Sequence, residues 1–587
     1  MRYALFLILG LRTFLPLVLA QLPLPQPPFL PPDASSGAKT SSGALPNRQW
    51  STLLGNLLYF YEAQRTGQLP SSNRVSWRNS SVVDDGKSAG LDLSGGYFDA
   101  GDFIKATFPL SFTLMSVCWG AMDYGKGYDM ANQTAYLDDM LRWGLDWLMK
   151  AHPNESTLYV LVGSTDTDNS YWGGDQNIPT PRPVYQINDT HPGTDAAAGA
   201  AAAFAACSGL YYNKGFKNDT FSTPAQLKNT TYADTLLTHA RDLYTFAVNA
   251  TNGRKTYQTS VPEVAAGYGS SDYGDEMAIA ALFLSWATDS PSLYAEAEGY
   301  WQKYKLAQQT RVFNWDSKAP GLPVLFAQIA DSSSTIGGNF TAWQIQAEKY
   351  FDDIVNNDGP GYLTDDGLLF YDGDSDSASL NPALNAAMLL SRFAPMASST
   401  DKRSSYTTFS KLQLDYALGN NSMSVPYIVG SNPNSPSNPH SAMASGGNDI
   451  SQIDNDPEEM AYTLFGAVVG GPHKSGKFYD IRSDWPETEI ALDYNAPMLT
   501  LTAMHVISDS SDPFYTSLKA GAYEKVKPQG LPCDPVFPKA CVGPQLSKGG
   551  KIAMALVLAI TGLIIIGLSV WYFILAGRRV VALKSSS

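Results

Sequence analysis

The stretch from residue 47 to residue 507 constrains the fold most, because its 461 residues contain no linker-like segment. Apolar residues recur there at helical spacing, and Gly, Pro, Asn and Asp separate one helical segment from the next. Alternation typical of a strand is scarce and is clearest at 158–162. Helical segments follow one another at intervals of roughly 40 residues, which predicts one all-α domain, a helical barrel or solenoid with its chemistry on the loops at one end. The clearest expected helices are 137–150, 194–211, 273–287, 343–356, 381–393 and 406–418.

Charge and aromatic content narrow the class of ligand. The chain carries 40 Lys and Arg against 55 Asp and Glu, a net charge of −15, so we expect no nucleic-acid partner. Its 12 Trp, 32 Tyr and 25 Phe favour flat, neutral ligands such as sugars. Four cysteines are too few for a small disulfide-framework protein.

The first 46 residues read as a leader. Residues 1–20 combine Arg2, an apolar run and the small-residue ending Val18-Leu19-Ala20, which predicts a signal peptide cleaved before Gln21. The alternative is an uncleaved anchor. Residues 21–46 are rich in Pro, Ser and Gly, a composition that forms no packed core, and we expect a flexible leader.

The C-terminal end predicts a membrane anchor. Residues 552–576 are uncharged and long enough to cross a hydrocarbon core of about 30 Å. The basic residues of 577–587 follow at once, so the positive-inside rule predicts a cytosolic tail and a single-pass type I protein of the cell membrane, with its main body outside. A lipid anchor signal is the weaker alternative, because such a signal ends on its hydrophobic tail. The polar residues 508–551 are expected to form a stalk; the oligomeric state is left open.

Sequons and cysteines also indicate an extracellular body. Nine N-x-S/T sequons lie between the two hydrophobic ends, at Asn79, Asn132, Asn154, Asn188, Asn218, Asn229, Asn249, Asn339 and Asn420. Cys533 and Cys541 are expected to close a small loop by a disulfide in an oxidising compartment. Cys118 and Cys207 lie in apolar surroundings, as two buried thiols or as one bridge.

Two carboxylate segments are candidates for chemistry. In Gly95-Gly96-Tyr97-Phe98-Asp99-Ala100-Gly101-Asp102, two aspartates three apart can hold a water and take its proton, although such a segment is also typical of a turn or a helix cap. In the segment 487–496, Glu487 and Glu489 precede a helical run and can simply stabilise the helix N-terminus. Hydrolysis of a glycosidic bond needs one carboxylic acid and one carboxylate, and histidine is scarce, with six in the chain.

These residues and their order resemble glycoside hydrolase family 9, the endo-β-1,4-glucanases with an (α/α)6-barrel catalytic domain, here in a membrane-anchored form. The similar blocks run through most of 47–507: FYEAQRTG at 60–67, WR at 77–78, DLSGGYFDAGD at 92–102, WG at 143–144, KAHP at 150–153, TPRP at 180–183, HPGTD at 191–195, YGDE at 273–276, WD at 315–316, GGP at 470–472 and EIALDYNA at 489–496. The resemblance implies an endoglucanase that hydrolyses cellulose-type β-glucans in one step with inversion.

The resemblance also implies roles for individual residues. Asp102 would be the general base, Asp99 would position the attacking water and Glu489 would be the general acid. An inverting site needs about 6.5–9.5 Å between acid and base, and Glu489 should have a raised pKa. Trp315, Tyr371, Trp172 and Tyr494 would line the cleft, although an aromatic side chain of a helical barrel more often lies in the core.

Three departures from the family pattern concern sugar contacts. His440 is followed by Ser441 and Ala442, so a sugar-binding arginine is missing and His440 alone remains there as a substrate contact. Asn169 replaces a family histidine after Asp166-Thr167-Asp168, and Ser270 replaces an aromatic residue. The substrate could therefore be another β-linked glycan, such as xyloglucan, mixed-linkage glucan or a chitosan-like oligomer, or the domain could be an inactive wall-binding module.

No cofactor is required by this reading, but a structural Ca²⁺ is possible. Oxygen ligands suit this hard cation, and the resemblance implies a candidate set near the YGDE block. The alternative is a group of ordinary acids at a helix start. The candidate ligands are Ser271, Asp272, Asp275, Glu276 and Asp316.

Overall fold

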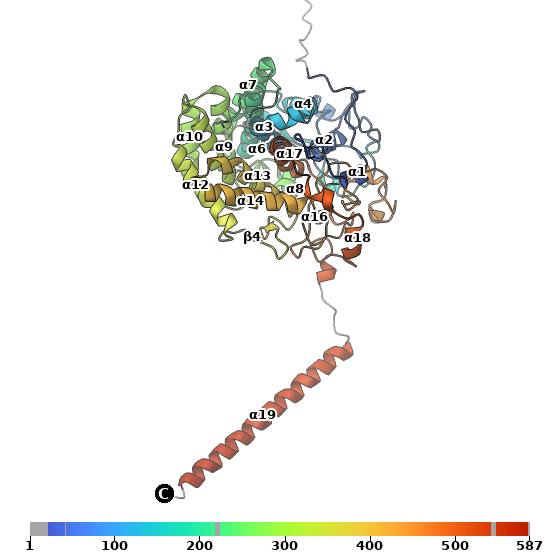
Figure 1. Cartoon of the computed structure of the whole chain (residues 1–587), viewed down its shortest axis with the longest axis vertical. Helices are drawn as coiled ribbons and strands as arrows, with labels where there is room; N and C mark the ends of the chain where they lie inside the picture. The colour runs from blue at the N-terminus through green and yellow to red at the C-terminus, as the bar shows by residue number, and fades with distance from the viewer. Residues whose placement is uncertain (1–20, 42, 218–222, 542–547, 585–587) are drawn as a thin grey trace, which may run out of the picture. The chain divides into compact units, whose positions relative to one another are not determined.

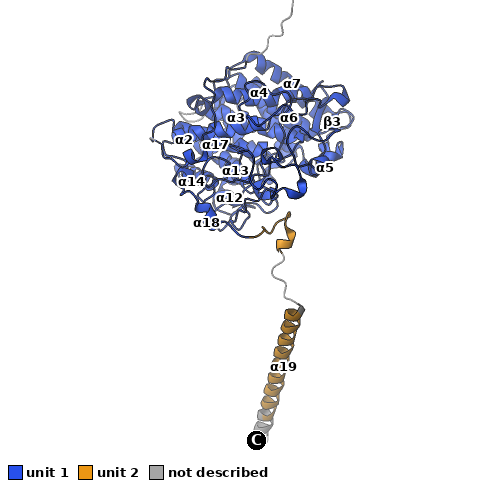
Figure 2. Cartoon of the chain, turned by 90° about the vertical axis from the view of Figure 1, so that its right-hand side faces the viewer, with its two compact units in different colours: residues 1–529 blue, residues 530–587 orange. Residues whose placement is uncertain are grey.

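The computed structural model describes residues 21–41, 43–217, 223–541 and 548–584, so the predicted signal peptide and the Asn218 sequon lie outside the described residues. The chain divides into two compact units at Gln529 and Gly530 (Figure 2). The first unit holds the helical domain, and the second holds the C-terminal apolar helix.

Twelve α-helices of eleven residues or more, in the described part of the first unit, alternate between an inner and an outer ring (Figure 1). Each inner helix packs against the next, and the last packs back on the first, so the ring is closed. This confirms the predicted (α/α)6 barrel. The inner helices are α3 (Thr107–Met130), α6 (Thr194–Tyr211), α9 (Gly274–Thr288), α11 (Leu322–Ser332), α13 (Leu380–Phe393) and α17 (Leu492–Ser508). The outer helices are α2 (Arg48–Ala63), α4 (Thr134–Ala151), α7 (Thr230–Asn249), α10 (Pro291–Lys303), α12 (Phe340–Val355) and α14 (Thr400–Ala417).

Sequence pattern explains which helix lies in which ring. Every residue of α6 is buried, and its many alanines let neighbouring helices approach on all sides. The outer helix α4 instead buries one stripe, Leu137, Leu141, Leu145 and Leu148, at helical spacing. A helix that is apolar all round belongs inside, and one with a single apolar stripe belongs at the surface.

Smaller elements complete the barrel. β1 (Lys105–Ala106), β2 (Thr157–Val162) and β3 (Val184–Asn188) form an antiparallel sheet in which Leu158 pairs with Ile187, and β2 confirms the expected strand. The hairpin of β4 (Tyr362–Leu363) and β5 (Leu369–Phe370) is separate. The short helices are α1 (Ala34–Gly37), α5 (Thr165–Asp168), α8 (Ala265–Tyr268), α15 (Ala442–Ser445), α16 (Trp485–Thr488) and α18 (Ala522–Val526). Each outer helix brings the chain back to the end of the barrel at which the previous inner helix began. The six inner helices therefore all start at the same end of the barrel.

The expected flexible leader is wrong for residues 21–41, which are docked on the barrel. The Phe29 ring lies against α2 at Gly55, where a Cβ would come within 2.5 Å of it. The Phe29 amide donates to the Tyr136 hydroxyl at 2.8 Å, and Arg74 Nη1 donates to the Phe29 carbonyl at 2.9 Å. Leu22 also packs on the core. The segment forms no core of its own, but its apolar side chains pack against the core of the barrel.

The expected stalk also begins too early at residue 508. Tyr515 and Tyr523 are buried, and Asp512 accepts hydrogen bonds from the Ser41 amide and the Asn47 side chain, both at 2.9 Å. The Trp50 indole donates to the Ser511 carbonyl at 2.9 Å. The first unit therefore continues to Gln529. The composition of 508–529 is mostly polar, so the two tyrosines that anchor this segment in the barrel do not stand out in the sequence.

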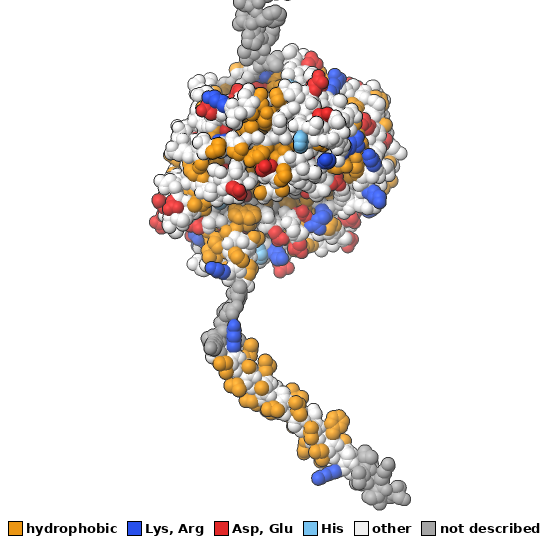
Figure 3. Space-filling view, turned by 180° about the vertical axis from the view of Figure 1, so that it is seen from behind, with side chains coloured by type: hydrophobic (Ala, Val, Ile, Leu, Met, Phe, Trp, Pro, Cys, Tyr) orange, Lys and Arg blue, Asp and Glu red, His pale blue; other side chains and the backbone are white. Residues whose placement is uncertain are grey.

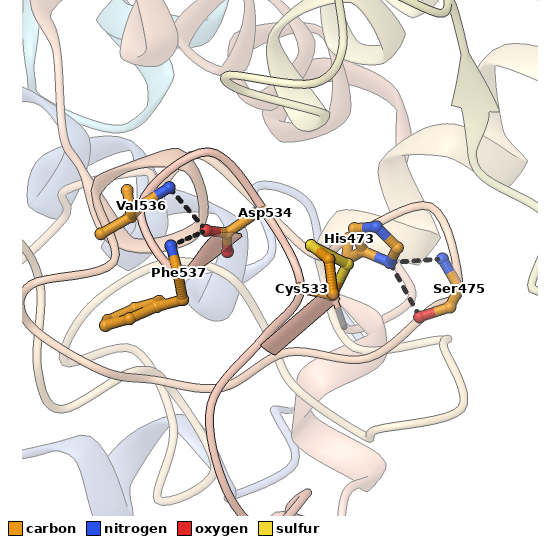
Figure 4. Close-up of a disulfide and its surroundings, with 7 residues drawn as sticks. His473, Ser475, Cys533, Asp534, Val536 and Phe537 are labelled. Atoms are coloured by element: carbon orange, nitrogen blue, oxygen red, sulfur yellow. Dashed lines mark hydrogen bonds between the residues drawn. A yellow bond between two sulfur atoms is a disulfide. The ribbon is translucent and has the colours of Figure 1, made fainter. Parts of the chain in front are cut away.

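Both cysteine pairs are bridged. Cys118 of α3 and Cys207 of α6 form a disulfide between neighbouring inner helices, which decides between the two expectations for this pair. Cys533 and Cys541 form the second, as predicted. Near it, Asp534 accepts hydrogen bonds from the amides of Val536 and Phe537 (Figure 4).

The second unit contains α19 (Lys548–Lys584). Its segment Gly549–Arg578 is long and apolar enough to cross a membrane, in agreement with the span expected at 552–576. Hydrophobic side chains cover this helix, whereas acidic and basic side chains are scattered over the displayed face of the barrel (Figure 3). The helix therefore suggests a membrane anchor.

Candidate active site

Main-chain hydrogen bonds join three distant segments at one end of the barrel. The Leu492 amide, at the start of α17, donates to the Asp99 carbonyl at 3.1 Å. The Ala442 amide donates to the Gly101 carbonyl, and the His440 amide to the Thr488 carbonyl, both at 2.9 Å. These bonds bring both predicted aspartates, His440 and Glu489 together.

Gly101, between the two aspartates, permits this close approach. A Cβ at position 101 would lie 2.1 Å from the His440 carbonyl oxygen, which no side chain tolerates. The glycine of the Asp99-Ala100-Gly101-Asp102 segment is thus needed for backbone contact rather than for a turn.

Glu489 has the environment of a proton donor. Burial raises the pKa of Glu489 to about 7, and the carboxylates of Asp102 and Asp493 add to the rise, while His440 and the Gly101 amide oppose it. The predicted rise in its pKa is confirmed. A carboxylic acid with such a pKa keeps its proton near neutral pH.

Asp102 and His440 face Glu489 from the other segments. One carboxylate oxygen of Asp102, one of Glu489 and one ring nitrogen of His440 all lie within 4.8 Å of one another. This spacing between oxygens is shorter than the 6.5–9.5 Å expected between the two carboxyl groups of an inverting site. The stereochemical outcome therefore stays a prediction.

The carboxylates beside His440 favour its charged form. Burial disfavours its charge, but the Asp102 and Glu489 carboxylates outweigh burial and raise the pKa of His440 to about 9. Its Nδ1 lies 2.7 Å from the Arg482 carbonyl oxygen and its Nε2 lies 3.9 Å from Asp102 Oδ2. The Trp172 ring lies edge-on to the imidazole, with the two ring centres 5.0 Å apart.

Asp99 lies deeper than Asp102. Burial raises the pKa of Asp99 well above its ordinary value, although the Tyr268 hydroxyl, which donates to Asp99 Oδ2, opposes the rise. By contrast, the Asp102 side chain is 18% exposed. The partly exposed Asp102 can contact a water molecule, whereas the buried Asp99 is better placed to hold that water from behind.

Three further residues belong to this cluster and were not predicted as site residues. Tyr268 ends the short helix α8, which carries no recognisable motif. Asp168 accepts a hydrogen bond from the Phe103 amide at 2.6 Å, and burial together with Asp102 raises its pKa well above the ordinary value. Burial raises the pKa of Asp493 to about 7, against the hydrogen bond from the Asn381 side chain. An acid at the start of an inner helix was the available signal for Asp493.

The predicted aromatic contacts divide into two groups. Trp315 is half-buried, with its ring edge-on to Tyr268 and the two ring centres 5.0 Å apart, and Tyr494 is half-buried beside the carboxylate cluster, so their sugar contacts stay a prediction. Trp172 is 2% exposed and Tyr371 is 1% exposed, so neither offers a face to a sugar. Platforms at Trp172 and Tyr371 do not fit this burial, because Tyr371 packs in the main core and Trp172 packs in a smaller apolar cluster, edge-on to His440.

The predicted Ca²⁺ ligands do not form one oxygen cage. Lys318 donates from its amide to Asp275 and from Nζ to Glu276 Oε1, the latter at 2.7 Å, so one ammonium faces two buried acids, and Glu276 Oε2 has no hydrogen-bond partner among the described residues. Asp316 accepts hydrogen bonds from Ser271 at 2.8 and 2.9 Å, and Asp272 accepts one from Gln309 at 2.9 Å. Ca²⁺ binding by these five residues therefore stays a prediction, and no step below uses Ca²⁺.

The helical barrel and its carboxylate cluster together indicate the class of enzyme. A helical barrel that gathers a glutamic acid of raised pKa, a partly exposed aspartate and half-buried aromatic rings at one end has what glycoside hydrolysis requires. The family model of glycosyl hydrolase family 9 matches residues 50–502. The chain belongs to this family.

Several relatives support the assignment. The chain is 32% identical over 451 residues to Endoglucanase A of Bacillus pumilus, covering 76% of this chain and 64% of that protein. It is 32% identical over 489 residues to the Endoglucanase of Phaseolus vulgaris, covering 78% and 92%. The solved structure of the endoglucanase from the termite Nasutitermes takasagoensis superposes with a TM-score of 0.69 and 34% identity, covering 78% and 98%. The chain thus spans less than two thirds of the Bacillus protein.

Proposed function

We propose that this protein is a membrane-anchored endo-β-1,4-glucanase that cuts cellulose-type glucans. The observation that carries the proposal is the half-buried Glu489, whose pKa is raised to about 7 and whose carboxylate oxygen lies within 4.8 Å of an oxygen of the partly exposed Asp102. Membership of a family whose named relatives are endoglucanases supports the choice of substrate.

The proposed mechanism assigns one role to each carboxyl group. Glu489 gives its proton to the glycosidic oxygen as the bond to the anomeric carbon breaks. Asp102 takes a proton from the water that attacks this carbon from the opposite side, and inversion follows. Asp99, held by Tyr268, supports the water, and His440 stabilises the charge on Asp102.

The second candidate is hydrolysis of a different β-linked glycan. Ser441 and Ala442, which follow His440 where the resemblance implies a sugar-binding arginine, are both fully buried. The site therefore lacks one expected sugar contact. Xyloglucan, mixed-linkage glucan and chitosan-like oligomers are the alternatives, followed by an inactive wall-binding module.

A glycan panel tests the proposal. Detergent-solubilised full-length protein is incubated with carboxymethylcellulose, mixed-linkage glucan, xyloglucan and chitosan, and reducing ends are counted. We expect the fastest release from the cellulose-type polymer, with a rapid fall in viscosity because internal bonds are cut. Release from chitosan or xyloglucan alone would replace the substrate assignment, and no release above the Glu489→Gln variant on any glycan would leave the binding-module reading.

The pH profile should report the proton on Glu489. Because the acid must be protonated, kcat/KM on the polymer is expected to fall as pH rises through about 7, by up to tenfold per pH unit above it. The measurement is kcat/KM between pH 4 and 9. Asp493 also has a pKa of about 7, so the Asp493→Asn variant is the matched control, and it should retain the alkaline fall. A profile without that fall in the unmodified protein would contradict Glu489 as the acid.

We also propose a type I topology at the cell membrane, with the barrel outside. The apolar α19, two disulfides and sequons on the barrel support it. Protease added to intact cells should remove the barrel, and full protection of the barrel would contradict this orientation.

A further inference from the structure

The cluster at the candidate active site also has the donor set of a transition-metal site. Asp102 and Glu489 each offer one carboxylate oxygen and His440 offers one ring nitrogen, all within 4.8 Å of one another. Zn²⁺ takes imidazole and carboxylate ligands, and many of its sites use three protein ligands with a fourth position left for water. The imidazole distinguishes this set from an ordinary acidic cluster.

The orientation of His440 is the second observation. Its Nδ1 donates to the Arg482 carbonyl at 2.7 Å, which leaves Nε2 facing the carboxylates, 3.9 Å from Asp102 Oδ2. Imidazoles that bind metals are commonly held in this way, with the other ring N–H on a carbonyl oxygen. Trp172, edge-on at 5.0 Å, limits rotation of the ring. Nε2 therefore already faces both oxygens, and an ion that binds there displaces its proton.

We propose that Asp102, His440 and Glu489 bind a divalent transition-metal ion, with Zn²⁺ as the representative, and that the bound ion blocks the site. Zinc–ligand bonds of about 2.0–2.2 Å place the donors of a tetrahedral ion roughly 3.4 Å apart, so the side chains must close in by about 1 Å. The Asp102 and His440 side chains, 18% and 11% exposed, border the open side of the cluster. Ca²⁺ and Mg²⁺ should bind more weakly, because they prefer oxygen-only shells.

We expect the bound ion to inhibit hydrolysis, because its ligands Asp102 and Glu489 are also the proposed base and acid. This expectation rests on the proposed function. An ion held by these three side chains occupies both the proposed acid and the proposed base. Zn²⁺ should therefore lower kcat/KM on the glycan, and a chelator should restore activity. Metal binding itself does not depend on hydrolysis, so a calorimetric test remains decisive if no glycan is cut.

Isothermal titration of ZnCl₂ into the detergent-solubilised full-length protein tests the site. We expect one ion per chain, at least tenfold weaker binding by His440→Gln, and unchanged binding by His191→Gln, which alters an exposed histidine away from the cluster. CaCl₂ is expected to bind at least tenfold more weakly than ZnCl₂.

Two results would overturn the proposal: no zinc uptake by the unmodified protein at millimolar concentration, or equal affinity in His440→Gln. If that variant does not fold, the visible spectrum of Co²⁺ added to the unmodified protein decides instead. Intense absorption indicates a tetrahedral protein site, whereas the weak spectrum of the hydrated ion rejects it.

Discussion

Replacing Glu489 by Gln or Asp102 by Asn should lower kcat/KM on the glucan polymer by about 10²–10⁴-fold, the range expected for loss of one acid–base group. Each change keeps the shape of the side chain and removes its ability to exchange a proton. KM should change little, because neither group is proposed to hold the sugar in its ground state. Initial rates of reducing-sugar release on the purified full-length variants supply the measurement.

Substrates with different leaving groups separate the two roles. A fluoride or dinitrophenyl leaving group departs without a proton, so Glu489→Gln should recover most of its activity on such a cellooligosaccharide, whereas Asp102→Asn should not. Asp84→Asn, at an exposed surface acid, is the control and should match the unmodified protein. Recovery in Asp102→Asn instead would exchange the two assignments.

The configuration of the first product decides the stereochemistry. The short spacing between oxygens of Asp102 and Glu489 makes this measurement informative. Inversion predicts that the α-anomer appears first in the proton NMR spectrum of the digest. An initial β-anomer would mean retention and would require one carboxylate to act as a nucleophile.

Arg392→Met should lower the free energy of unfolding by about 3–5 kcal/mol, the usual cost of removing one partner of a buried ion pair. Arg392 and Asp123 are both fully buried between inner helices α13 and α3, and their side chains form a salt bridge. Gln328 donates to the same aspartate at 2.8 Å, and the Arg392 guanidinium lies 3.9 Å from the Trp119 ring centre. Methionine fills most of the volume but leaves Asp123 without its cation. Chemical denaturation followed by tryptophan fluorescence provides the value.

The effect of Arg392→Met should depend on pH. Burial raises the pKa of Asp123 to about 6 while Arg392 opposes the rise, so loss of Arg392 should raise it further. A carboxyl group with a raised pKa contributes its full stability below its unfolded-state pKa, near 4, and loses it as pH rises through the folded-state pKa. The loss of unfolding free energy in Arg392→Met should therefore be larger at pH 8 than at pH 5. The double variant Arg392→Met/Asp123→Asn is the control and should recover much of the loss at pH 8; a deficit equal at both pH values would contradict the ion-pair explanation.

The helices were the most predictable part of the fold. Segments 137–150 and 194–211 correspond closely to α4 and α6, because helical periodicity is a local property of the chain. The two flanking segments were harder to predict. Residues 21–41 and 508–529 have compositions typical of loops, but they pack through Phe29, Tyr515 and Tyr523, whose partners lie on distant helices.

The part of the candidate site that lies in short sequence motifs was predicted from the sequence. Asp99, Asp102 and Glu489 meet as expected, since small residues and main-chain hydrogen bonds let their segments approach. Tyr268 and Asp168 were not predicted, because each acts through a residue far away in sequence.

The sequence by itself determined the helical periods, the carboxylate motifs, the family and the apolar C-terminal helix, since each depends on residue types at short spacing. Only the tertiary structure decided that Trp172 and Tyr371 lie in the core while Trp315 remains half-buried beside Tyr268. It also decided the approach of His440 to Asp102 and the burial that raises the pKa of Glu489. An aromatic ring or a carboxyl group has the same formula in a core and in a cleft, and its exposure depends on which distant segments the closed ring of helices brings beside it.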